Sequence, residues 1–178
     1  MELFDVYDRF RQPLGRTIPR GEAFSADEFR IVIHVAIFND SGQMLIQRRV
    51  DGKQGWGGMW DVSAGGSIQS GESSGVGATR EVAEEIGIDF NFSDKLPQLT
   101  VTTQSVFDDY YIIRLTPDIS TLKLQETEVA EIKWADFNEI AEKIRSGIFI
   151  PYHESFIKTL FDIDSNTNSK SVVRFADE

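Results

Sequence analysis

The chain has 178 residues, 40% of them hydrophobic and none of them cysteine, which suits a single core without disulfide bonds. Its 29 acidic and 18 basic residues give a formal net charge of −11, which argues against a nucleic-acid polymer or an anionic membrane as partner. No apolar run follows Met1, and no stretch is long enough to span a bilayer. We therefore expect one cytoplasmic domain.

The first part of the chain is predicted to form strands. A short strand is expected at Leu3–Tyr7, followed by an irregular connection rich in Arg, Pro and Gly from Arg9 to Ala26. Ile31–Phe38 is almost continuously apolar, which is typical of a central strand. The turn over residues 39–42 leads into a further strand, Met44–Arg49, so these two strands are predicted to form a hairpin.

The remaining elements alternate between strands and helices. Residues 60–64 lead into a glycine pair, and a helix is expected after it. Residues 1–163 are predicted as one domain and residues 164–178, which begin with a polar stretch, as a mobile tail with docking residues Val172, Val173 and Phe175. Periodicity predicts helices at Gly75–Ile86, Phe137–Arg145 and Tyr152–Ile163, and strands at Leu99–Val106, Tyr110–Leu115 and Ile132–Trp134.

The helix over Gly75–Ile86 has a signal at each end. Ser73 or Ser74 can cap its start, and Gly87 stands where a left-handed residue ends a helix. The apolar residues recur at three- and four-residue steps, so one face is predicted to be buried and the charged side chains to lie elsewhere. The predicted buried residues are Val76, Thr79, Val82, Ala83 and Ile86.

The same helix carries two unfavourable features. Glu81, Glu84 and Glu85 project within about one turn, where each like-charge pair costs roughly 0.2–0.5 kcal/mol. Gly75 and Gly77 each weaken a helix by about 1 kcal/mol relative to alanine. We interpret both features as serving a hard divalent cation.

A divalent cation accounts for the residue types around this helix. Mg²⁺ takes oxygen ligands and is usually held by one or two carboxylates, with waters and substrate phosphates in the remaining positions. Glu72 returns from the loop before the helix, and Arg80 can hold that carboxylate by a two-pronged contact. The pair Gly65 and Gly66 is predicted to turn tightly and to bring a carbonyl oxygen near the ion.

The spacing of these residues is more specific than their types. An isolated R-E-x-x-E-E is more often surface decoration than a site. Here the whole stretch resembles the signature of the Nudix hydrolase family, G-x5-E-x7-R-E-U-x-E-E-x-G-U with U aliphatic. It matches at every position, through Gly66, Glu72, Arg80, Glu81, Val82, Glu84, Glu85, Gly87 and Ile88. The resemblance implies an α+β Nudix fold, a mixed sheet sandwiched between helices, over about residues 1–163.

The resemblance also implies a reaction. A Nudix enzyme cleaves a nucleoside diphosphate linked to some moiety X by directing water at phosphorus, with Mg²⁺ or Mn²⁺ as cofactor. The implied metal ligands are Glu81, Glu84, Glu85 and the carbonyl of Gly65. The base varies among members of the family: Glu81 is one candidate, and a glutamate on a loop is the other. Glu128 stands where that loop glutamate is expected, with Glu126 as the alternative and an exposed acidic loop as the competing interpretation.

Phosphate contacts are expected from the end of the strand Met44–Arg49. Strand alternation lets only one of its two arginines face the site, and we favour Arg49, with Lys53 nearby, against a solvated salt bridge. His34 is interpreted as a hydrogen-bonded core histidine and left out of the metal site. Two tryptophans, Trp56 and Trp60, either stack on a base or close the core.

Three other segments look like the Nudix branch related to type I isopentenyl-diphosphate isomerase: DVYDRFRQPLGRTIPRGE, IHVAIFNDSGQMLIQRR and GMWDVSAGG. Those isomerases use an essential cysteine and several metal-binding histidines, whereas this chain has no cysteine and two histidines. A hydrolase acting on a small phosphorylated molecule is therefore the first hypothesis, ahead of a non-catalytic ligand-binding module and an isomerase. The identity of X stays open, as does the choice between a monomer and a homodimer.

Overall fold

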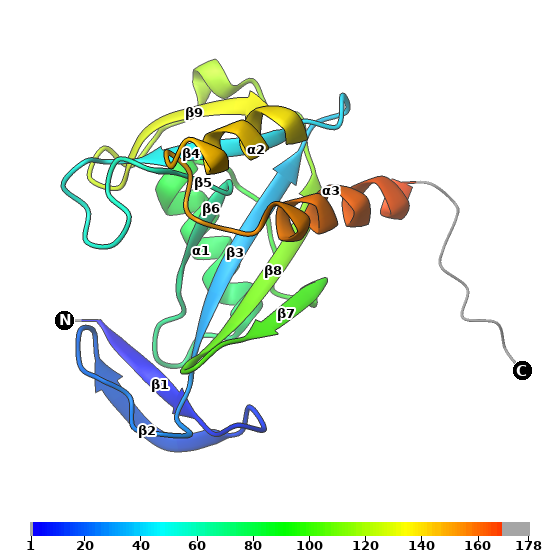
Figure 1. Ribbon diagram of the computed structural model, residues 1–178. Coiled ribbons are helices and arrows are strands. Elements are labelled where there is room, and N and C mark those ends of the chain that lie inside the picture. Colours follow the sequence, from blue (N-terminus) through cyan, green and yellow to red (C-terminus); the bar gives the residue numbers. More distant parts are fainter. Residues whose placement is uncertain (1, 169–178) are drawn as a thin grey trace, which may run out of the picture. The chain divides into compact units, whose positions relative to one another are not determined.

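The computed structural model describes residues 2–168 (Figure 1). The chain up to Val35 forms one compact unit together with Ala64–Tyr111. Ala36–Ser63 and the chain from Ile112 onward form a second unit. Within the described residues, no helix combines the length and the apolar character that crossing a membrane requires.

The first unit begins with an antiparallel ribbon, drawn in blue in Figure 1. Its strands are β1 (Leu3–Tyr7) and β2 (Pro13–Pro19), and their buried core consists of Phe4, Val6 and Ile18. The prediction of an irregular connection over Arg9–Ala26 is therefore wrong. β2 escaped prediction because most of its side chains are exposed and prolines stand at both ends, so it shows no apolar alternation.

The rest of this unit positions one helix beside one short strand. The strands are β3 (Arg30–Phe38), β6 (Ala64–Ser67), β7 (Leu99–Thr102) and β8 (Val106–Arg114), of which β3 and β8 continue into the second unit. β3 pairs antiparallel with β6, and β7 pairs antiparallel with β8. The turn between β7 and β8 comes earlier than predicted, so Val106 opens β8 instead of closing β7. Helix α1 (Ser74–Ile86) packs along β6 (Figure 1).

Both predicted ends of α1 are confirmed. Ser73 accepts a hydrogen bond from the Val76 amide, and Gly87 has φ 70° and donates to carbonyls of the last turn. The predicted buried face is partly wrong, because Val76 is 40% exposed and Ala83 is also exposed. Residues that the structure buries include a carboxylate and two glycines: Gly75, Gly77, Ala78, Val82, Glu85 and Ile86.

The two glycines inside α1 have a packing role. A Cβ atom at Gly75 would lie 2.3 Å from the Phe92 carbonyl oxygen, and one at Gly77 would lie 2.6 Å from Ile68 Cγ2. Any larger residue would push the helix away from these neighbours. The interpretation that these glycines serve a cation is therefore wrong, since close approach of the chain accounts for them.

The second unit contains a hairpin and two helices. Phe38, at the end of β3, pairs with Met44 of β4 (Met44–Arg49), as predicted. β4 also pairs antiparallel with β5 (Trp60–Asp61) and with β9 (Val129–Ala135), which is longer than predicted. A 3-10 turn over Ile119–Thr121 precedes β9.

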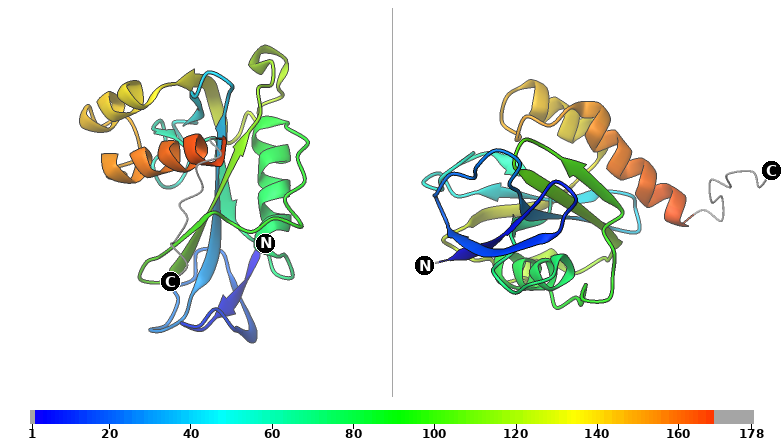
Figure 2. Two further views of the ribbon diagram at one scale, coloured as in Figure 1. Left: turned by 90° about the vertical axis from the view of Figure 1, so that its right-hand side faces the viewer. Right: turned by 90° about the horizontal axis from the view of Figure 1, so that it is seen from below.

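Helices α2 (Phe137–Arg145) and α3 (Glu154–Asn168) follow β9 and lie next to each other, as Figure 2 shows. The bounds of α2 agree with the prediction. α3 continues past residue 163, so the expected start of the tail falls inside this helix. The candidate docking residues Val172, Val173 and Phe175 lie outside the described residues.

Candidate metal and catalytic site

The glycine pair before α1 lies in an extended strand. Gly65 and Gly66 belong to β6, where they pair with His34 and Ile33 of β3, so the predicted tight turn is wrong. A Cβ atom at Gly66 would lie 2.3 Å from Glu81 Oε1, and one at Gly65 would lie 2.9 Å from the Ile33 carbonyl oxygen. Gly66 is required because α1 brings a carboxylate against the backbone of β6, whereas Gly65 is required because β3 lies close to it.

Two carboxylates of α1 are buried beside β6. The Gly65 amide donates a hydrogen bond of 3.0 Å to Glu85, which is only 2% exposed. The Glu81 side chain is 14% exposed and lies against Gly66. Burial raises the pKa of Glu81 to about 7, and the nearby charges of Glu85 and Glu84 add to the rise while Arg80 opposes it. A cation here would offset both the desolvation and the repulsion.

Arg80 connects the loop before α1 with the carboxylates on it. Its Nε donates to Glu72 Oε1 at 2.7 Å and its Nη2 donates to Glu72 Oε2 at 2.9 Å, so the predicted two-pronged contact is present. Its Nη1 donates to Glu81 at 2.8 Å and to Glu84 at 3.2 Å. Burial opposes the ionised form of Glu72, but hydrogen bonds from Arg80 and from the Gln69 amide hold its pKa below the ordinary value.

The three glutamates of the signature do not converge fully. Glu84 has a side chain that is 52% exposed and contacts Arg80. Among residues 2–168, no three or more His, Cys, Asp or Glu side chains are grouped closely enough to hold a metal ion. Glu81 and Glu85 nevertheless present the hard oxygen donors that Mg²⁺ or Mn²⁺ prefers, and Glu84 can change rotamer without repacking the core. The residues therefore fit such an ion.

The remaining predicted site residues belong to the second unit. Lys53 forms an ion pair with Glu128, whose carbonyl oxygen accepts from the Val50 amide at 3.1 Å. The Arg49 side chain is 13% exposed, and its Nη1 lies 3.8 Å from Asp61 Oδ2. The proposed phosphate ligand Lys53 and the proposed base Glu128 are thus partners, which the sequence reasoning did not foresee. Glu126 is exposed.

The histidine and tryptophan candidates have separate environments. His34 Nε2 lies 2.9 Å from Asp108 Oδ1 and the ring stacks on Tyr110, which confirms a hydrogen-bonded core histidine. Trp60 is 6% exposed and contacts two lysines of the second unit, so it closes the core. Trp56 is 53% exposed, so it does not close the core.

A buried ion pair in the first unit was missed at the level of sequence. The side chain of Asp109 is fully buried and accepts hydrogen bonds from Arg11, Ser74 and Thr100. Burial opposes its ionised form, but these donors outweigh burial and hold the pKa of Asp109 below its ordinary value. One signal was present: Asp109 stands at a buried position of β8, two residues after Phe107, and a buried carboxylate requires a partner.

Comparison with known proteins places this geometry in a family. The model for the NUDIX domain matches residues 28–154. An uncharacterized Nudix hydrolase of Listeria monocytogenes is 40% identical over 167 residues, which cover 94% of this chain and 98% of the relative. An isopentenyl-diphosphate Delta-isomerase of Shigella flexneri is 27% identical over 138 residues, 71% of this chain and 76% of the isomerase.

A solved structure resembles this chain in fold as well. The crystal structure of DR0079 from Deinococcus radiodurans aligns with a TM-score of 0.69 and 25% identity over 83% of this chain and 91% of that one. This likeness confirms the predicted α+β class, with a mixed sheet and three helices.

Proposed function

This chain belongs to the Nudix family, and we propose that it hydrolyses a diphosphate linkage in a nucleoside diphosphate joined to another group, or in a related small diphosphate. The observation that supports this most is the burial of Glu81 and Glu85 against the glycines of β6. The charges of these carboxylates repel each other and raise the pKa of Glu81, and a hard cation bound between them would offset that repulsion.

Glu81, Glu84 and Glu85 would hold Mg²⁺ or Mn²⁺, together with the carbonyl oxygen of Gly65. When bound, the ion neutralises charge on the phosphate oxygens and lowers the pKa of water. Arg80 positions Glu81 through a 2.8 Å hydrogen bond. The hydrogen bond from Arg80 to Glu72 keeps the guanidinium in place. Arg80 and Glu72 therefore act as positioning residues.

The attacking water must lose a proton, and a carboxylate is the natural acceptor. Glu81 is one candidate, since Arg80 and Gly66 fix its position. Glu128 is the other, and it forms an ion pair with Lys53, the proposed phosphate ligand. Glu126 stays the weaker alternative on the same loop.

Arg49 and Lys53 are proposed to contact the phosphates of the substrate. Arg49 Nε is buried and has no hydrogen-bond partner within residues 2–168, so a phosphate oxygen would satisfy it. Isomerase chemistry is less well supported, because the chain has no cysteine. The similarity to an isomerase of Shigella flexneri concerns that protein and leaves the present substrate open.

The test is release of phosphate or pyrophosphate from a panel of nucleoside diphosphate derivatives, with and without Mg²⁺. Glu85→Gln removes the buried charge while keeping the shape of the side chain, so turnover should fall by about two orders of magnitude or more while the circular dichroism spectrum stays native. Glu142→Gln changes an exposed glutamate of α2 and is the control. Tight binding of a nucleotide without Mg²⁺-dependent turnover would instead favour a ligand-binding module.

A further inference from the structure

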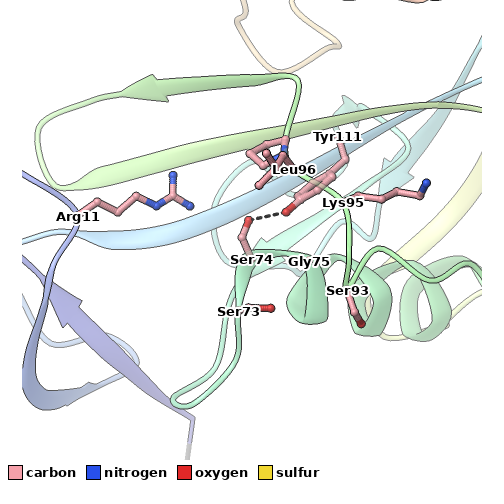
Figure 3. Close-up of a pocket in the computed structure, with 9 residues that line it drawn as sticks. Arg11, Ser73, Ser74, Gly75, Ser93, Lys95, Leu96 and Tyr111 are labelled. Atoms are coloured by element: carbon pink, nitrogen blue, oxygen red, sulfur yellow. Dashed lines mark hydrogen bonds between the residues drawn. The ribbon is translucent and has the colours of Figure 1, made fainter.

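The first unit contains a cavity of about 490 Å³ at the first turn of α1 (Figure 3). Ser74 and Tyr111 form part of its wall and are joined by a 3.0 Å hydrogen bond from the tyrosine hydroxyl. Cavities that hold small ligands commonly measure about 300–1,000 Å³. Ser74 precedes Glu81 by seven residues, which is about 10 Å along a helix, so this cavity is separate from the buried glutamates.

The two charged residues that line the cavity are both positive. Arg11 and Lys95 both line it, and no acidic residue does. Figure 3 shows them at opposite ends of the group, with Ser74, Leu96 and Tyr111 between them. Because Asp109 balances the charge of Arg11, the positive charge that remains to attract an anion is that of Lys95.

Both cations can still serve a ligand. Lys95 forms no ion pair with any residue of the described part of the chain, and its ammonium lies over the Phe90 ring at 5.4 Å. Arg11 donates Nη1 to Asp109 at 2.8 Å and also uses Nη2 for this carboxylate. A guanidinium has five N–H donors, so the Asp109 contact orients Arg11 without using all of them. The Arg11 side chain is 33% exposed.

The cavity also offers apolar surface, whereas its hydroxyl hydrogens are already used, by Tyr111 on Ser74 and by Ser74 on Asp109. Leu96 is 84% exposed, although a leucine gains free energy when it is covered. It stands next to Pro97 and above the hydroxyl groups of Ser74 and Tyr111. An inorganic ion would leave Leu96 exposed, whereas a molecule with an apolar part would cover it.

We propose that this cavity binds a small organic oxyanion, with its charged group held by Arg11 or Lys95 and its apolar part on Leu96. The site differs from the carboxylate cluster in place and in charge, and its occupancy requires no divalent metal. A phosphate monoester and a carboxylate share the chemistry that this lining recognises.

The experiment is an NMR titration of the full chain in EDTA, with phenyl phosphate and benzoate as separate probes. Binding at this site should shift the amide signals of Ser74, Gly75 and Leu96 and leave those of Glu84 and Glu85 in place. The tighter of the two probes identifies the charged group. If neither probe shifts these three signals, or if shifts are confined to the carboxylate cluster, the proposal is overturned.

Matched variants make the assignment specific. Lys95→Glu should weaken binding of the better probe by about fivefold to tenfold. Lys123→Glu makes the same charge change at an exposed lysine of the second unit and should leave the affinity unchanged. Equal affinities of the two variants would refute the role of Lys95. Glu85→Gln should bind the probe like the parent protein, so the outcome is independent of the proposed hydrolysis.

Discussion

Arg80 and Glu72 are eight residues apart in the chain, yet they meet through two hydrogen bonds of 2.7 and 2.9 Å. Their side chains are only 17% and 15% exposed, so solvent screens the contact weakly. The pair fixes the loop before α1 to the middle of the helix. Because the same guanidinium contacts Glu81, the geometry of the buried carboxylate depends on the loop.

Replacing this arginine is expected to affect stability and activity together. Arg80→Lys keeps the charge but loses the planar two-pronged contact, so the free energy of unfolding should fall by about 1.5–3 kcal/mol. Turnover should fall because Glu81 is no longer held. Urea denaturation measures the first effect and the hydrolysis assay the second. Arg145→Lys changes a two-pronged pair with Glu154 in which Arg145 is 64% exposed, and it should cost clearly less than Arg80→Lys.

A single methyl group at Gly66 should displace the Glu81 carboxylate. Gly66→Ala places its Cβ where the Glu81 carboxylate lies, so this side chain must move. We expect the affinity for Mn²⁺, followed by calorimetry, to fall at least about tenfold, with a comparable loss of activity. Gly52→Ala, in a loop where a Cβ meets nothing within 4 Å, is the matched control. Unchanged Mn²⁺ affinity in Gly66→Ala would remove Glu81 from the metal site.

The buried pair of Arg11 and Asp109 predicts a dependence of stability on acid. The pKa of Asp109 is lowered in the folded protein, so the unfolded chain binds the proton more tightly. The resulting stabilisation is complete above the unfolded pKa, about 4, and is lost as the pH falls through the lower, folded pKa. In denaturant melts from pH 6 down to pH 2, Asp109→Asn should reduce stability at pH 6 and flatten the acid limb. Asp94→Asn changes an exposed carboxylate, and a curve of the same shape for both variants would contradict this prediction.

Metal binding should stabilise the folded chain. At a free ion concentration of 100 times Kd, one site adds about 2.7 kcal/mol to the free energy of unfolding. The melting temperature should therefore rise with Mg²⁺ or Mn²⁺ and return with EDTA, and the shift should be absent in Glu85→Gln. If EDTA changes neither the melting temperature nor the turnover, the proposed metal cofactor is contradicted.

The two candidate loop glutamates can be separated by kinetics. If Glu128 is the base, Glu128→Gln should lower kcat by about 10²-fold or more with little change in KM. Glu126→Gln, on the same loop but exposed, should have no such effect. Loss of kcat in Glu81→Gln with full activity in Glu128→Gln would assign the base to Glu81 instead.

The sequence predicted the local features of the site well. The cap at Ser73, the left-handed Gly87 and the contact of Arg80 with Glu72 all depend on residues close in the chain, where spacing determines geometry. The family signature extended this local reading to the α+β fold. β2 lacked an apolar alternation and was missed for that reason.

Contacts between distant segments could not be read in the same way. Gly75 and Gly66 are needed because Phe92 and Glu81 pack against them, and the sequence does not indicate these two contacts. The sequence predicted that Glu85 lies away from the buried face. Helical periodicity does not indicate that the Gly65 amide of β6 donates a hydrogen bond to it there. The ion pair of Lys53 with Glu128 likewise joins residues 75 positions apart in number, which no spacing rule relates.

Within the stretch from Gly65 to Gly87, the contacts that hold Glu72 and Glu85 in place join residues of the stretch itself. The Gly65 amide of β6 donates to Glu85, and Arg80 holds the loop through Glu72. The stretch begins in a strand and ends at the left-handed Gly87. Transplanting this strand and helix into another α+β scaffold would keep these contacts but would require its outside neighbours to be rebuilt. The recipient would need a partner strand for β6 and an apolar surface under Val82 and Ile86.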